Sequence, residues 1–348
     1  MTLTAAVPPS VTLPSKQDRL LSGLESSAEQ NFARVVAQAY GFRVSNRWDR
    51  TVQNVKDDIQ STDPRYQNCT VDTLEKVVDR VIISANHHYS IYKLSLADST
   101  QVRAALSGLI GQAINNNYAK TYPDLVDFDL YPTAIPDHYL CKVVDMDDGI
   151  ACIFASVEKE AIRGYRAMSS TMITSQYFHT VFIPHNADRI EIRISDKTPS
   201  RFHDKHFVAI NNAFIDILAQ QGVRYTGILV NLFGCITSYF NDAGSGRIAY
   251  AILTTGQDSK DAELKNLKSN DYCARTQKVV DTKNNFSYEC RAILLRKQCT
   301  QNSSDETEVS FFPHKGVWEA NSCWSVQIKK PQTSIVLNSI ISDVLARA

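Results

Sequence analysis

The chain has 348 residues, of which 43% are hydrophobic and 21% charged, a composition typical of globular proteins that excludes wholesale disorder. Lys and Arg number 37, as do Asp and Glu, so a basic field over the whole chain is excluded. No run of ~18 apolar residues occurs, and the first residues lack the pattern of a secretory signal. We therefore expect no membrane segment, a cytoplasmic location and eight reduced cysteines.

The first third of the chain is predicted to be mainly helical. Ser15 can cap a helix whose apolar stripe runs to Ala39, and Gly41 then ends it. Thr70 is expected to cap a second helix and Asp98 a third, because short polar side chains satisfy the first free backbone N–H groups of a helix.

Two hairpins are predicted in the middle of the chain. The first joins strands at Tyr139–Val144 and Ile150–Val157 through residues 145–149, which end in Asp-Gly, a strong hairpin signal between apolar runs. The second joins strands at Phe178–Ile183 and Arg189–Ile194 through a turn that begins with a proline.

The second hairpin carries the clearest periodicity of the chain. Arg189, Glu191 and Arg193 alternate with three isoleucines, a pattern that predicts a strand with one exposed and one buried face. About ten residues later the period becomes helical, and we expect a long packed helix that begins near Ser200 and continues to Leu218.

The remaining elements are predicted mostly as strands. A closing helix is expected at Ile335–Leu345. The strands are expected at Tyr225–Phe233, Ile236–Phe240, Ile248–Leu253, Tyr288–Leu295, Val309–Phe312 and Cys323–Ile328.

These elements predict an α+β fold: a helical N-terminal region, then a mixed and largely antiparallel sheet domain with one long packed helix. Three prolines between Lys120 and Asp137 indicate the boundary between two domains. The predicted divisions are a disordered tail at 1–14, a helical domain at 15–119, a linker at 120–137 and an α+β domain at 138–348.

One group of residues has the composition of a metal site. Three carboxylates crowd the first hairpin turn, and two histidines three residues apart share a helical face, as metal ligands do. The alternative is a solvated turn, because Asp and Gly are the residues such a turn requires, and a pair of buried histidines at the start of the helix. The candidate ligands are Asp145, Asp147, Asp148, His203 and His206.

A second group of residues has the composition of a nucleic-acid-binding surface. Residues 264–299 hold eight Lys and Arg against three acidic residues, with aromatic residues between them, and such a mixture can grip phosphates and stack on bases. The alternative is a solvated polar segment between strands. The basic residues are Lys265, Lys268, Arg275, Lys278, Lys283, Arg291, Arg296 and Lys297.

No signature of catalysis or of a bound cofactor occurs in the sequence. A GxSxG elbow, a GxxxxGK[ST] phosphate loop, a GxGxxG fingerprint and a CxxC pair are all missing. We therefore expect a non-catalytic binding protein or a subunit of a larger assembly, with no cofactor, a protein partner and nucleic acid as a second partner. Two alternatives stay open: a metal-dependent hydrolase or nuclease that uses the clustered carboxylates, and a viral structural protein. The sequence does not determine the oligomeric state.

Overall fold

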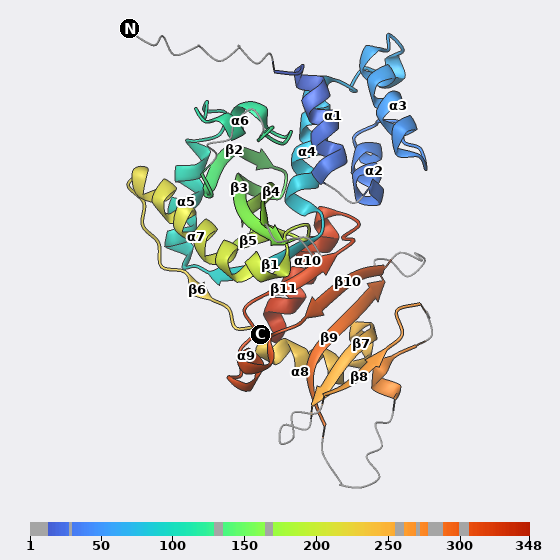
Figure 1. Cartoon of the computed structure of the whole chain (residues 1–348), viewed down its shortest axis with the longest axis vertical. Helices are drawn as coiled ribbons and strands as arrows, with labels where there is room; N and C mark the ends of the chain where they lie inside the picture. Colours follow the sequence, from blue (N-terminus) through green and yellow to red (C-terminus); the bar gives the residue numbers. More distant parts are fainter. Residues whose placement is uncertain are drawn as a thin grey trace.

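The computed structural model describes residues 13–27, 30–128, 135–163, 170–254, 261–268, 272–277, 288–298 and 306–348. Ten helices surround one antiparallel sheet of eleven strands in this part of the chain, so the predicted α+β class is confirmed (Figure 1). The strands are β1 (His87–Lys93), β2 (His138–Met146), β3 (Gly149–Arg163), β4 (Ser170–Pro184), β5 (Arg189–Ser195), β6 (Ile228–Leu229), β7 (Arg247–Thr254), β8 (Asp261–Lys265), β9 (Glu289–Gln298), β10 (Glu306–Phe311) and β11 (Val326–Lys329). The helices are α1 (Lys16–Ser27), α2 (Gln30–Ala39), α3 (Trp48–Gln60), α4 (Val71–Ser84), α5 (Leu96–Ser107), α6 (Asn117–Thr121), α7 (His203–Gln220), α8 (Phe233–Asn241), α9 (Lys315–Glu319) and α10 (Ser334–Arg347).

The sheet consists of two halves that meet along a short seam. The strand order is β2-β3-β4-β5-β1-β11-β10-β9-β7-β8, and β6 adds to β1. We call β2-β3-β4-β5-β1 the N-terminal half-sheet and β11-β10-β9-β7-β8 the C-terminal half-sheet. The seam between them is the pairing of β1 with β11, in which His88 lies opposite Gln327. Figure 1 shows the N-terminal half-sheet above and the C-terminal half-sheet below.

Helices cover both faces of the N-terminal half-sheet. On one face, α4 buries residues such as Val77 against Ile153 and Phe182, in a core that also includes α1 and α2. On the other face, α7 packs Phe214 against the isoleucines of β5, of which Ile192 is fully buried. Complete burial of each such side chain stabilises the fold by roughly 1.5–3 kcal/mol relative to leaving it exposed.

Helices cover the C-terminal half-sheet on one face. Here α8 and α10 place Tyr239 and Ile341 against a core that contains Leu295 and Val309. The alternate residues of the same strands are less well covered, and Phe312, which follows β10, is 45% exposed. The long α7 and the hairpins β2–β3 and β4–β5 confirm the corresponding predictions.

The predicted exposed face of β5 is wrong. Arg189, Glu191 and Arg193 are 7%, 0% and 1% exposed, because α4 and its neighbours cover this face as well. The Arg193 guanidinium donates to Glu191 Oε2 at 2.6 Å and to the Ile83 carbonyl at 2.8 Å. It also lies 3.9 Å from the centre of the Phe182 ring. The three charged residues therefore form a buried, fully engaged ladder.

Several predicted helix boundaries and strands also differ from the structure. The predicted helix that begins after Ser15 is two helices, α1 and α2. The third helix is capped by Ser95, whose Oγ accepts the Asp98 N–H at 3.0 Å, so the predicted cap lies three residues too late. Asp98 is itself a preferred capping residue, which explains the error.

The predicted strands at 225–233 and 236–240 are wrong. The structure has the two-residue β6 and then the helix α8, whose buried Cys235, Ile236 and Tyr239 have helical spacing. β-Branched and aromatic residues favour strands, but packing on the sheet outweighs that preference here.

The strand β1 was not predicted, although it lies at the centre of the sheet and pairs with β5, β6 and β11. Through β1 and α1–α4, residues 15–119 share the sheet and its core with residues 138–348. The division at 120–137 stays a prediction, and residues 1–12 and 129–134 lie outside the described residues. Among the helices that the structure describes, none combines the length and hydropathy of a membrane-spanning segment.

Candidate functional site: a projecting two-stranded arm

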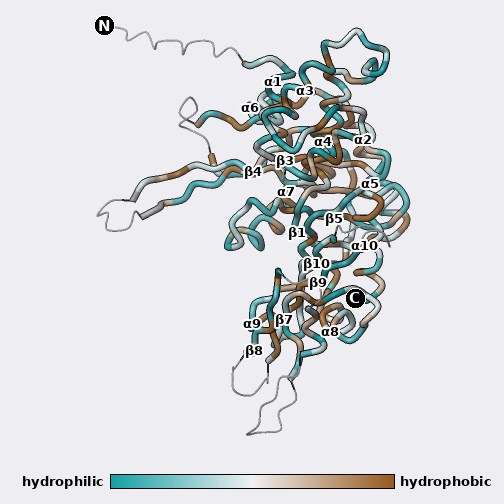
Figure 2. Tube along the Cα trace, turned by 90° about the vertical axis from the view of Figure 1, so that its right-hand side faces the viewer, coloured by the Kyte–Doolittle hydropathy of each residue, from teal (hydrophilic) through white to brown (hydrophobic). Residues whose placement is uncertain are grey.

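The hairpin β3–β4 extends beyond the rest of the sheet. Its strands pair without interruption from Gly149 opposite Pro184 to Arg163 opposite Ser170. The neighbouring strand β2 ends its pairing at Ser156, and β5 pairs with β4 only around Val181. Within the described residues, 157–163 and 170–176 therefore form a ribbon with no third strand, which we call the arm. Figure 2 shows it projecting from the body of the molecule.

The arm exposes apolar side chains on both of its faces. Met172 is 59% exposed and Ile173 is 43% exposed. Adjacent residues of a strand point to opposite faces, so each face presents one of them to solvent. Thr171 and Ala161 are also exposed, and Lys159 is half-buried.

Ion pairs with α7 and the turn before it hold the base of the arm. Glu158 accepts hydrogen bonds from Lys205 Nζ at 2.8 and 2.9 Å through its two carboxylate oxygens. Glu160 pairs with Arg201, which lies in the turn just before α7. The side chain of Glu158 is 7% exposed, whereas that of Lys205 is 58% exposed, so the pair joins a buried carboxylate to a lysine at the surface.

A buried histidine relay ends on the same carboxylate. The backbone N–H of Ser195 donates to His179 Nδ1 at 3.2 Å, which leaves the His179 proton on Nε2. His179 Nε2 then donates to His206 Nδ1 at 2.8 Å, so His206 carries its proton on Nε2, 3.1 Å from Glu158 Oε1. Both rings are neutral in this arrangement.

Burial keeps the relay neutral near pH 7. It lowers the pKa of His206 to about 4, with a further contribution from His138, and the pKa of His179 lies well below its usual value for the same reason. His138 itself bonds to Ser156 Oγ at 2.6 Å. The hydrogen bonds among these histidines fix the position of each ring and so help to hold the base of the arm. Protonation of a ring would break the hydrogen bond that its acceptor nitrogen makes.

The structure places the predicted metal ligands in separate contacts. The exposed Asp145 lies 3.0 Å from His185 Nε2, and Asp147 is exposed. Asp148 accepts from Arg80 at 2.7 Å and from Asn338 at 3.0 Å. Burial alone would raise the pKa of Asp148, but the charge and hydrogen bond of Arg80, together with Arg193 and Asn338, outweigh burial and lower the pKa.

The two predicted histidine ligands also have different neighbours. His206 belongs to the relay, whereas His203 packs its ring 4.0 Å from that of His88 and donates to the Thr198 carbonyl at 2.8 Å. Across the described ranges, no three His, Cys, Asp or Glu side chains are grouped so that they could hold a metal ion.

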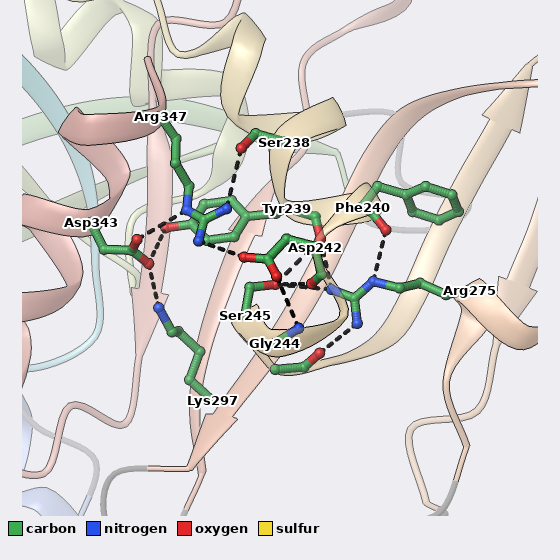
Figure 3. Close-up of polar contacts among 11 residues, drawn as sticks. Ser238, Tyr239, Phe240, Asp242, Gly244, Ser245, Arg275, Lys297, Asp343 and Arg347 are labelled. Atoms are coloured by element: carbon green, nitrogen blue, oxygen red, sulfur yellow. Dashed lines mark hydrogen bonds and ion pairs between the residues drawn. The ribbon is translucent and has the colours of Figure 1, made fainter.

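Two of the predicted nucleic-acid-binding residues make internal contacts near α8 (Figure 3). Arg275 donates to the carbonyls of Tyr239, Phe240 and Gly246 at 2.5–2.7 Å. Lys297 pairs with Asp343 of α10. The charge of each is therefore engaged within the fold.

The other predicted basic residues lie on or near the C-terminal half-sheet. Arg291 pairs with Asp261 at 2.5 Å, and Arg296 bonds to Glu308 at 3.1 Å. Lys265 lies 5.8 Å from the centre of a tyrosine ring and Lys268 is exposed, whereas Lys278 and Lys283 lie outside the described residues. Nucleic-acid binding by this segment stays a prediction.

The sequence did not predict the arm. The predicted strands stopped at Val157 and began again at Phe178, because the residues between them have no clear apolar alternation. A usable signal was present in Ser170–Gln176, a run of β-branched and polar residues without Gly, Pro or Asp that can continue a strand.

Comparison of the chain with protein-family models, with curated proteins and with solved structures gave no match.

Proposed function

We propose that the protein is a non-catalytic binding protein that acts as a subunit of a larger assembly, and that the arm attaches it to a second copy of the chain. The observation that carries this proposal is the arm, which has no third strand on either edge within the described residues and exposes the side chains of Met172 and Ile173. The seven cysteines within the described residues are free thiols, which supports the cytoplasmic location expected from the sequence.

The physical reason is that an isolated two-stranded ribbon has little stability of its own. Two strands without a third strand or a covering helix are marginally stable in water, and unpaired edges invite another strand. Lys205 of α7 and Arg201 of the turn before it bind Glu158 and Glu160 and so anchor the base of the arm. A rigid base with an apolar, edge-exposed extension suits attachment to a partner.

A cleft elsewhere on the same chain suggests the partner. The cleft has a volume of about 770 Å³ and lies between α2 and the ends of β9 and β10. Its lining includes Val35, which is 41% exposed, and Arg34. In Figure 2, α2 lies on the side of the molecule opposite the arm. Arm and cleft on opposite sides favour a head-to-tail contact, which builds rings or filaments.

The test is the molar mass in solution as a function of concentration, measured by size-exclusion chromatography with light scattering. The wild-type chain is expected to exceed the mass of one chain as the concentration rises. The double substitution Met172→Asp with Ile173→Lys, and separately Val35→Glu, should each leave a monomer. Leu96→Asp is the matched control, because Leu96 is 70% exposed and belongs to α5.

Mixing the two defective variants sharpens the test. In a head-to-tail contact, the intact arm of the Val35→Glu chain fits the intact cleft of the arm variant, so the mixture should form dimers that do not grow further. A wild-type chain that stays monomeric at every concentration would refute a second copy as the partner. Association that survives both variants would refute the assigned surfaces.

Nucleic-acid binding through 264–299 and a carboxylate-based hydrolase remain alternatives to be tested. A shift assay with single- and double-stranded DNA and RNA, with and without Mg²⁺ and at two salt concentrations, separates them. Salt-sensitive retention supports the first alternative. Mg²⁺-dependent loss of substrate supports the second.

A further inference from the structure

A pocket opens at the seam between the two half-sheets, away from the arm. It has a volume of about 250 Å³ and lies between β1, β10, β11 and the start of α7. Two exposed aromatic side chains belong to its lining: Trp324 is 43% exposed and Phe312 is 45% exposed. Ligand pockets often lie where two parts of a fold meet, and the volume suits a ligand smaller than a typical drug.

Contacts across the seam hold one imidazole of the pocket by its Nε2 atom. Gln327 points its Nε2 amide group toward the Asp196 carboxylate, which can only accept, and its Oε1 accepts from Ser310 Oγ at 3.0 Å. His88 Nε2 lies 2.9 Å from the same amide group and 3.3 Å from Asp196 Oδ1. The Nδ1 atom of His88 is thereby left for a ligand.

The neighbouring imidazole is also held by its Nε2 atom. His203 donates its Nε2 proton to the Thr198 carbonyl, which leaves Nδ1 as an acceptor. Burial, with a contribution from His88, lowers the pKa of His203, so the ring stays neutral near pH 7. Within the described part of the chain, neither Nδ1 atom has a hydrogen-bond partner in the protein.

The formal charges of the lining restrict the ligand further. Among the described residues that line the pocket, Asp204 is the one formally charged residue, and none is Lys or Arg. Phosphate and carboxylate ligands require cationic or clustered N–H donors, so they are disfavoured. Imidazole nitrogens beside exposed aromatic rings suit a planar, uncharged heterocycle instead.

We propose that the seam pocket binds a nucleobase or nucleoside, with the heterocycle against Trp324 and its polar edge on His88 and His203. The pocket contains no residue of the arm, so ligand binding is tested independently of the proposed assembly.

Tryptophan fluorescence provides a direct test. The chain has three Trp residues, and Trp48 and Trp318 are 9% and 8% exposed, so Trp324 is the one open to a ligand. Adenosine, guanosine, cytidine and uridine are titrated separately, and at least one should quench the emission saturably. Adenosine 5′-monophosphate should bind more weakly than adenosine, because none of the described lining residues is Lys or Arg.

Substitutions identify the site by calorimetry with the best nucleoside. Trp324→Ala and, separately, Phe312→Ala should weaken binding about tenfold, as expected for loss of a stacking ring. Trp324→Phe should remove the fluorescence change but retain most of the affinity. His185→Ala is the control, because His185 lies in the β4–β5 turn, outside the pocket lining, where it contacts Asp145.

The variants with exposed substituted residues are expected to fold, and thermal unfolding confirms it for each. The proposal is overturned if none of the four nucleosides produces quenching or heat. It is also overturned if the monophosphate or the organic cation choline binds more tightly than every nucleoside, or if His185→Ala weakens binding as much as Trp324→Ala.

Discussion

Charged residues that alternate with apolar ones along a strand are buried in the N-terminal half-sheet but partly exposed in the C-terminal half-sheet. In β5, charged residues alternate with isoleucines, and the charged face is buried beneath helices, with Arg193 1% exposed. In β9, Leu295 is buried in the core of the C-terminal half-sheet, whereas the side chain of Arg296 is 15% exposed and pairs with Glu308. Alternation determines which residues share a face, and helices from elsewhere in the chain decide whether that face meets water.

This difference changes what each ion pair contributes. A buried charge that loses its partner keeps its desolvation cost without compensation, whereas a pair near solvent is replaced by water. The buried ladder of β5 should therefore be sensitive to single changes. The pairs on the open face of the C-terminal half-sheet should tolerate them.

The largest expected effect is at the buried ladder. Arg193→Ala should lower the free energy of unfolding by about 3–5 kcal/mol, because Glu191 remains buried without its main partner. Arg296→Ala should cost less, because the Arg296 side chain is 15% exposed and water can reach Glu308 once it is removed. Chemical denaturation of both variants measures the difference.

A variant that removes the whole ladder provides the control. Replacing Arg189 and Arg193 by Met together with Glu191→Leu should recover most of the lost stability, because no buried charge is left. Equal costs for Arg193→Ala and Arg296→Ala would contradict the contrast between the half-sheets.

The next effect is the response of the covered N-terminal half-sheet to acid. Burial lowers the pKa of His87 from 6.5 to about 4, and its Nδ1 proton is donated to the Ala85 carbonyl. Between pH 6.5 and about 4, His87 binds a proton in the unfolded chain but not in the folded chain. Its contribution to stability is therefore fully present above pH 6.5 and is lost as the pH falls. His87 alone should lower the free energy of unfolding by about 3 kcal/mol as the pH drops from 6.5 to about 4.

Denaturation at a series of pH values tests this slope. His87→Phe should reduce the decline between pH 6.5 and 4, while the contributions of His179 and His206 remain. An unchanged slope in this variant would show that His87 does not resist protonation in the folded state.

An intermediate effect is expected where α8 and α10 meet below the C-terminal half-sheet. Asp343 accepts from Tyr239 at 2.9 Å, from Arg347 at 2.9 Å and from Lys297 (Figure 3). Asp343→Ala should cost about 1–3 kcal/mol, because the buried Tyr239 hydroxyl loses its acceptor.

Tyr239→Phe on its own separates this hydrogen bond from the rest of the network. Combined with Asp343→Ala it should add little, since the hydroxyl that lost its acceptor is then absent. Full additivity of the two changes would contradict the assigned coupling.

The smallest effect should be alike in both half-sheets. Thr70 caps α4 and Thr333 caps α10, and each accepts a backbone N–H at the third residue beyond it. Alanine at either position should cost about 1 kcal/mol, as measured by thermal unfolding, because capping is a local interaction. A much larger cost at one cap would mean that the surrounding layer also depends on it.

Local signals predicted much of the fold. The caps at Ser15 and Thr70, the hairpin turn before Gly149, the long α7 and the closing helix all depend on neighbours in sequence, and the structure confirms them. The strand β1 and the helix α8 were missed because their states depend on packing against distant strands. The arm was missed for a similar reason, since its residues have no core face that would produce apolar alternation.

The sequence by itself determined the α+β class, the alternation of each strand and the composition of the basic and acidic clusters. Tertiary structure alone decided that the face of β5 with Glu191 is buried and that Arg275 and Lys297 make contacts inside the fold. It also decided that His203 and His206 contact different neighbours. The reason is that periodicity arises from bonds between near neighbours, whereas burial and ion pairing depend on which distant segment covers each face.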